Sequence, residues 1–179
     1  MIYAFLANGF EEIEAISVID ILRRAGHEVK TVGVGGKEIK GSHGISVLTD
    51  IADSQVETDD MTMVFLPGGM PGTLNLEKSP IVRASVDYCV KNGMIVAAIC
   101  AAPSILGHWN LLNGKEAICF PGYEQELFGA RISAEPVCAD GNIITGKGAG
   151  VALEFALKIV EVLSGAEISR KLRASLQCR

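Results

Sequence analysis

The chain has 179 residues, 49% of them hydrophobic and 21% charged, and its formal net charge is −5. This apolar content excludes an intrinsically disordered chain, which combines low hydrophobicity with high net charge. The 16 basic and 21 acidic side chains, with no basic block, argue against a nucleic-acid partner.

Size and cysteine usage indicate a single domain over residues 1–179. The first apolar segment, Ile2–Ala7, lacks the cationic lead of a signal peptide. The longest wholly apolar run, Met94–Ala102, is about half as long as a membrane span. The odd number and wide spacing of the cysteines give no disulfide or zinc pattern: Cys89, Cys100, Cys119, Cys138 and Cys178. We expect a reduced, cytoplasmic protein without a membrane partner.

Short apolar runs alternate along the chain with longer segments of helical spacing. Runs that are apolar at every position are typical of strands covered on both faces, so the pattern predicts an α/β domain with a mostly parallel sheet. The predicted strands are Ile2–Ala7, Glu28–Val34, Thr62–Leu66, Met94–Ile99, Glu116–Phe120 and Asn142–Thr145. Small antiparallel additions are predicted where Gly35-Gly36 precedes Ile45–Thr49 and where Cys138–Gly141 precedes Asn142–Thr145. The last predicted helix is Val151–Leu163.

Three glutamates follow the first predicted strand. A helix is predicted from Glu12, with apolar residues at spacings of three and four as far as Leu22 and a C-capping glycine at Gly26. The carboxylates of Glu11 and Glu12 are expected to face water and to interact with the helix dipole. Glu14 has apolar neighbours and is expected to point inward, as a candidate acid or base with a raised pKa.

The next strand end carries two glycines. Pro67-Gly68-Gly69 follows Thr62–Leu66 directly. Glycines allow the backbone to approach a ligand, and with the N–H after Cys100 they could form an oxyanion hole. A plain tight turn explains the same residues equally well.

The strand predicted over residues 94–99 ends in the strongest local signal. The chain reaches Cys100 and must turn at once into a helix near Ala101, with Pro103 in its first turn. Such a strand–helix turn lifts the residue at its apex into a pocket and requires small neighbours, here Ala98 and Ala102. The helix N-terminus would lower the thiol pKa, which makes this cysteine a candidate nucleophile. A small, buried, unreactive cysteine also fits the position.

Two other patterns lead to no binding site. Gly141–Gly148 resembles a phosphate-binding loop, but Gly148 stands where Ser or Thr is needed and the intervening residues read as a strand. His27, His43 and His108 share no metal-ligand spacing, so no metal site is expected. His27 and His108 are interpreted as surface or structural residues, while the role of His43, in a glycine-flanked loop, stays open.

Several co-linear blocks together resemble the ThiJ/PfpI superfamily, in the branch of the parkinsonism-associated deglycase. The blocks are Gly9–Glu14, Asp20–Gly26, Val64–Gly69, Ala97–Pro103 and Glu154–Glu161. The resemblance covers nearly the whole chain, and it implies a flavodoxin-like three-layer sandwich related to class I glutamine amidotransferase domains.

The resemblance also implies roles for individual residues. Cys100 matches the elbow cysteine of the family, and Glu14 matches the neighbouring acid, which is normally protonated and hydrogen-bonded to the sulfur. Gly69 and Ala101 match the backbone N–H donors. No cofactor is implied.

Three further positions concern the assembly and the chemistry. Relatives are usually homodimers; Arg24 matches an interface arginine, and His43 matches a loop position that approaches the partner subunit's site. Relatives with glyoxalase or deglycase activity commonly have a histidine where this chain has Phe120. A protease or amidase mechanism, which needs histidine to activate the nucleophile, is therefore disfavoured.

The residues and the resemblance lead to a cysteine-dependent, cofactor-free enzyme that acts on methylglyoxal-type carbonyls or their adducts. It would be a glyoxalase- or deglycase-type lyase or hydrolase. The alternative is an oxidative-stress redox sensor or chaperone whose Cys100 is oxidised to sulfinate. A role linked to thiamine (thiazole phosphate) biosynthesis or an intracellular protease ranks lower, because the sequence shows neither a phosphate cradle nor a triad.

Overall fold

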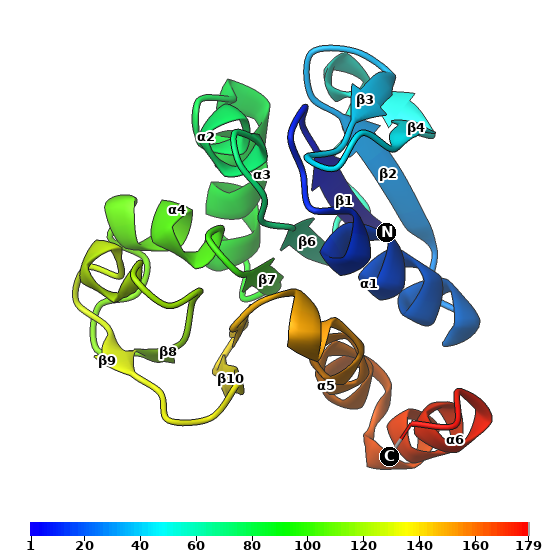
Figure 1. Ribbon diagram of the computed structural model, residues 1–179, viewed down its shortest axis with the longest axis vertical. Coiled ribbons are helices and arrows are strands. Elements are labelled where there is room, and N and C mark those ends of the chain that lie inside the picture. Colours follow the sequence, from blue (N-terminus) through cyan, green and yellow to red (C-terminus); the bar gives the residue numbers. More distant parts are fainter. Residues whose placement is uncertain (179) are drawn as a thin grey trace.

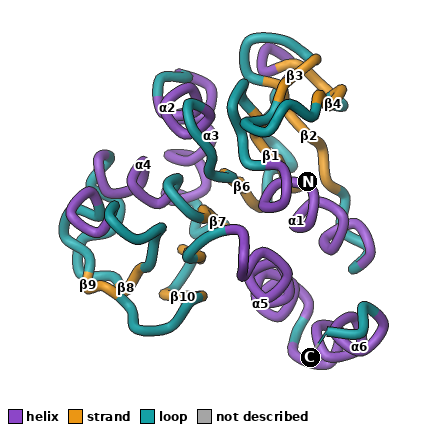
Figure 2. The backbone as a smooth tube through the Cα atoms, in the orientation of Figure 1, coloured by secondary structure: helices purple, strands orange, loops and turns teal. Residues whose placement is uncertain are grey.

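The computed structural model describes residues 1–178. A seven-stranded sheet forms its centre (Figures 1 and 2). In spatial order its strands are β10 (Val137–Asp140), β11 (Ile143–Gly146), β7 (Ile95–Ile99), β6 (Met63–Leu66), β1 (Ile2–Leu6), β2 (Val29–Gly33) and β5 (Ile51–Ala52). All neighbours are parallel except β10 and β11, which form an antiparallel pair. The predicted parallel sheet, and the antiparallel addition at its edge, are confirmed.

Helices cover both faces of this sheet (Figure 1). One face carries α1 (Glu12–Arg24) and α5 (Ala152–Ser164), with α6 (Ala166–Ser175) packed on α5. The other carries α2 (Gly72–Glu77), α3 (Pro80–Lys91) and α4 (Pro103–His108). Alternate strand residues point to opposite sides: Ile2, Ala4 and Leu6 of β1 join the core under α1 and α5, while Tyr3 and Phe5 join the other core. The flavodoxin-like three-layer sandwich is confirmed.

Two small sheets lie outside the central one. The hairpin β3 (Glu38–Lys40) and β4 (Ser46–Leu48) is antiparallel, as predicted. The strand predicted over Glu116–Phe120 is shorter, because β8 (Glu116–Ala117) pairs only with β9 (Arg131–Ile132). The next backbone groups are bonded elsewhere: the N–H of Ile118 donates to Thr145 Oγ1, and the N–H of Phe120 donates to the Cys100 carbonyl.

The order of the strands reverses between β1 and β6. From β1 the chain continues to β2 on one side, whereas β6 lies on the other side. In open α/β sheets ligands bind outside the carboxyl ends of the strands at such a reversal. Within residues 1–178, none of the helices is long and apolar enough to cross a membrane.

Candidate active site

Three segments meet at the carboxyl ends of β1, β6 and β7. The first turn of α1 after β1 contributes Glu14, the loop after β6 contributes Gly68 and Gly69, and the turn after β7 contributes Cys100. The parallel sheet thus brings together residues that are 54 positions (Glu14 and Gly68) and 32 positions (Gly68 and Cys100) apart in sequence.

Cys100 occupies a strained elbow. Its φ of 66° is left-handed, a conformation that costs a residue with a Cβ about 1–3 kcal/mol. The turn is held by the Cys100 N–H, which donates to the Gly146 carbonyl at 2.8 Å, and by the Phe120 N–H, which donates to the Cys100 carbonyl at 2.7 Å. The flanking Ala98 and Ala102 are fully buried, as the elbow requires. The side chain is partly buried and packs against the core under α1 and α5.

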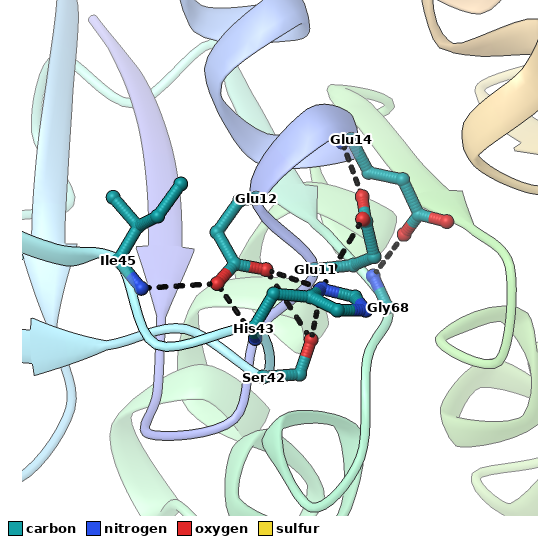
Figure 3. Close-up of polar contacts among 7 residues, drawn as sticks. All are labelled: Glu11, Glu12, Glu14, Ser42, His43, Ile45 and Gly68. Carbon is teal, nitrogen blue, oxygen red and sulfur yellow. Dashed lines mark hydrogen bonds and ion pairs between the residues drawn. The ribbon is translucent and has the colours of Figure 1, made fainter.

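Glu14 lies against this cysteine. It is fully buried, and its Oε2 accepts the Gly68 N–H at 2.9 Å (Figure 3). Its Oε1 makes no hydrogen bond of good geometry within the part of the chain that the structure describes. A Cβ on Gly68 would lie 2.6 Å from Cys100 Cβ, 2.8 Å from Glu14 Oε2 and 3.1 Å from Cys100 Sγ. Only glycine therefore allows the thiol and the carboxyl to come together here.

Two backbone donors complete the site. The N–H groups of Gly69 and Ala101 are directed at the Cys100 sulfur, where they lower the thiol pKa. Neither donates to a backbone carbonyl among residues 1–178. Gly69 has φ 91°, and a Cβ there would lie 2.4 Å from the Glu11 nitrogen, so the conformation that exposes this N–H requires glycine.

The ionisation of the pair differs from the sequence expectation. Burial raises the pKa of the Cys100 thiol to about 12, and the charge of Glu14 and its hydrogen bond with the thiol add to the rise. The prediction that a helix N-terminus lowers this pKa is wrong in direction: α4 begins only at Pro103, and a buried acid lies beside the sulfur. The prediction for Glu14 is confirmed, because burial raises its pKa to about 7 against the hydrogen bonds from Cys100 and Gly68.

Two groups that interact this closely titrate as one system. The pair loses its first proton well before its second, because the pKa of Glu14 is raised to about 7 and that of the Cys100 thiol to about 12. Between these values the pair shares one proton and carries one negative charge. That charge resides on the carboxylate or, when the proton moves to Glu14, on the sulfur, where the N–H groups of Gly69 and Ala101 stabilise it.

Glu12 does not face water as predicted. It is 6% exposed, and its Oε1 accepts the backbone N–H groups of His43 and Ile45 while its Oε2 contacts Ser42 Oγ and His43 Nδ1 (Figure 3). These hydrogen bonds outweigh desolvation and lower the pKa of Glu12 to about 2. Sequence reasoning missed this role because the partners lie about 30 residues away and meet Glu12 only when the hairpin folds over the helix. Glu11 caps α1, with Oε2 accepting the Glu14 N–H at 2.7 Å.

The three histidines lie in different surroundings. His43 is exposed in its loop, with Nδ1 2.9 Å from Glu12 Oε2 and 3.8 Å from Glu11 Oε1. These three side chains bring potential metal-ligand atoms within 4.8 Å of one another, a grouping that sequence spacing did not predict. His108 bridges Glu77 and Glu126, and His27 contacts Ser164, so both are structural as expected. None of the three hydrogen-bonds to Cys100 within the described residues.

Two other predicted positions lie at the surface. Arg24, near the end of α1, pairs with Asp20 at 2.6 Å. Phe120 is 47% exposed and stands beside Gly148, where an added Cβ would lie 3.3 Å from the ring. The position at which relatives commonly have a histidine is thus close to Cys100 but carries an apolar ring.

A cysteine at a strained strand–helix elbow, paired with a buried acid in a flavodoxin-like sandwich, defines a class of α/β protein. The model of the DJ-1/PfpI family matches residues 1–162, so the chain belongs to the DJ-1/PfpI family. This confirms the resemblance found in the sequence.

Individual relatives agree with this assignment. The chain is 39% identical over 165 residues to Protein dj-1beta of Drosophila melanogaster, covering 90% of this chain and 88% of the relative. It is 32% identical over 164 residues to the glutathione-independent glyoxalase DJR-1.2 of Caenorhabditis elegans, covering 90% of this chain and 87% of the relative. The structure of oxidized Toxoplasma gondii DJ-1 superposes with a TM-score of 0.95 at 35% identity, covering 98% of this chain and 97% of that chain.

Proposed function

We propose that the protein is a cofactor-free enzyme that converts small reactive carbonyls, such as methylglyoxal, into 2-hydroxy acids. The observation that carries the proposal is the Cys100–Glu14 pair, a nucleophile and a proton carrier in direct contact. The name of the Caenorhabditis elegans relative, a glutathione-independent glyoxalase, supports the same chemistry. Early adducts of these carbonyls with thiols and amines are a related substrate class.

The reaction needs no external oxidant or reductant. The Cys100 sulfur adds to the aldehyde carbon, and the oxygen, stabilised by the N–H groups of Gly69 and Ala101, takes the shared proton to give a hemithioacetal. Glu14 then removes the proton from the former aldehyde carbon and returns a proton to the adjacent carbon, while the hydroxyl proton transfers to the neighbouring oxygen. The product is a thioester of a 2-hydroxy acid. Water hydrolyses it and regenerates the thiol.

The proposal is tested by incubating the protein with methylglyoxal and following both substrate and product by proton NMR. We expect one lactate to form for each methylglyoxal lost, over many turnovers per subunit. If methylglyoxal loss stops at one equivalent per thiol and no lactate forms, the cysteine only forms an adduct with methylglyoxal. This result would refute the proposed enzymatic activity.

The second candidate function is redox sensing at Cys100. The buried Glu14, half protonated near neutral pH, could donate a hydrogen bond to a sulfinate, and a related structure is that of an oxidized protein. We expect mild peroxide to add two oxygens to Cys100 before it modifies any of the other cysteines, as read by mass spectrometry of peptides. Equal modification across all the cysteines would exclude this function. The buried Cys89, whose pKa is also raised to about 12, is an internal control that lacks a neighbouring acid.

A homodimer is part of the proposal. Exposed apolar side chains gather on one face formed by α1 and the β3–β4 hairpin: Ile13, Ile16, Ile45 and Leu48. A hollow of about 320 Å³ borders this face, lined by the apolar Ile16, Val47 and Leu48 and by polar and charged side chains that include Arg23 and Asp50, and a second copy could pack over it. Arg24 lies on the same helix. His43, in the same hairpin, is the residue that would approach the partner's site.

The interface is tested by one charge on this face. Ile16→Glu is expected to convert the dimer into a monomer in sedimentation velocity, because the carboxylate would be buried against apolar side chains. Val162→Glu on α5 is the matched control, since Val162 is 44% exposed and Ile16 is 45% exposed. A monomeric wild type, or an equal shift in both variants, would contradict this interface.

A further inference from the structure

A shallow apolar hollow adjoins the Cys100–Glu14 pair. Its volume is about 350 Å³, and it is lined by Phe120 and Pro121 on one side and by residues 147–151 on the other. Apart from Lys147, the lining residues are either apolar or glycine. The hollow therefore offers side-chain contacts to an apolar group and almost none to a polar one.

The hollow and the reactive pair share a wall. A Cβ on Gly148 would lie 3.3 Å from Phe120 Cδ2 and 4.0 Å from Glu14 Oε1, so the space that this glycine leaves open borders both the ring and the carboxyl. Oε1 makes no hydrogen bond of good geometry within the described residues, and the N–H of Ala149, in the wall of the hollow, interacts with the Glu14 carboxyl. On the other side, the backbone of Phe120 is tied to Cys100 by the 2.7 Å hydrogen bond to its carbonyl.

We propose that this hollow binds the substituent of a 2-oxoaldehyde substrate and selects apolar, including aromatic, substituents over small or hydroxylated ones. The inference rests on the proposed function. When the aldehyde carbon is bonded to Cys100, the adjacent carbon must reach Glu14 for proton return, and its substituent then lies towards Gly148 and Phe120. Burial of an apolar group there is favourable, whereas a hydroxyl would lose its water without a partner.

The test compares phenylglyoxal, which yields mandelate, with methylglyoxal, which yields lactate. We expect kcat/KM for phenylglyoxal to exceed that for methylglyoxal by about tenfold. Phe120→Ala is expected to remove most of this preference, while Phe120→Leu keeps it, because leucine restores an apolar wall. Comparing the ratio between variants cancels the intrinsic reactivity of the two carbonyls. Phe128→Ala is the matched control, because both phenylalanines are 47% exposed and Phe128 instead contacts the ring of His108 in a tilted arrangement.

A second measurement does not depend on turnover. Benzyl alcohol, which forms no adduct with a thiol, is expected to slow alkylation of Cys100 by iodoacetamide in the wild type and not in Phe120→Ala, while ethanol at the same concentration has no effect. Protection without turnover of either carbonyl would refute the proposed function and support the hollow as an apolar site. Turnover with the same substrate preference in the wild type and in Phe120→Ala, without protection of Cys100 by benzyl alcohol, would refute the proposal that the hollow binds the substituent. The proposed enzymatic function would still stand.

Discussion

Cys100→Ala is expected to abolish conversion of methylglyoxal to lactate, and Glu14→Gln to lower kcat/KM by about 10²–10⁴-fold. The first change removes the sulfur that holds the substrate covalently in the proposed reaction. The second keeps the size of the side chain and an oxygen that can accept the Gly68 N–H, but glutamine cannot take up or return a proton. Both rates come from the NMR assay of methylglyoxal loss and lactate gain.

The matched control for the cysteine is Cys138→Ala. Cys138 is buried, whereas Cys100 is partly buried, and it lies in β10 at the edge of the sheet, where its thiol donates to the Glu116 carbonyl at 3.3 Å. Its activity should equal that of the wild type. Full activity in Cys100→Ala, or equal losses in the two cysteine variants, would contradict the assignment of the nucleophile.

Gly68→Ala, which adds a single methyl group, is expected to lower both the stability of the protein and the rate of methylglyoxal conversion. The new Cβ would lie 2.6 Å from Cys100 Cβ and 2.8 Å from Glu14 Oε2, so the two side chains must separate. Overpacking of this kind costs about 1–3 kcal/mol of unfolding free energy. Displacing reacting groups by ~1 Å can cost about 10²-fold in rate. Urea unfolding and the methylglyoxal assay measure the two effects.

Gly150→Ala provides the stability control, because an added Cβ there meets no atom within 4 Å. Its unfolding free energy should stay within about 0.5 kcal/mol of the wild type. A Gly68→Ala protein with wild-type stability and activity would show that the thiol and the carboxyl do not need to be this close.

The fold was predictable where the signal is local. Strands buried on both faces must be apolar at every position, so the segments that became β1, β2, β6, β7 and β11 are visible as short apolar runs. The run over Glu116–Phe120 has the same composition but forms only a two-residue strand, because Thr145 and Cys100 take its later N–H groups. That competition depends on tertiary contacts and leaves no local trace in the sequence.

The site was predictable in its residues but not in its electrostatics. The elbow requires small residues around Cys100, so this cysteine could be found. Glu14 shares a helix face with the buried Val18, four residues later, and this spacing indicates its inward position better than its neighbour Ile13, which is 58% exposed. The ionisation of Cys100 and Glu14 depends on how deeply they are buried and on their mutual distance, which only the folded chain defines. Glu12 shows the same limit, because its backbone partners come from a hairpin about 30 residues away.

The most direct test of the account is the pH dependence of Cys100 alkylation in the wild type and in Glu14→Gln, read by mass spectrometry of the Cys100 peptide. We expect two steps in the wild type: a first rise near neutral pH, when the pair loses the first of its two protons, and a second at strongly alkaline pH, when it loses the shared proton. Glu14→Gln should lose the step near pH 7 and titrate in one step. Identical profiles in the two proteins, or a single wild-type step at about pH 8.5 as for a free cysteine, would show that the thiol and the carboxyl do not act as a pair.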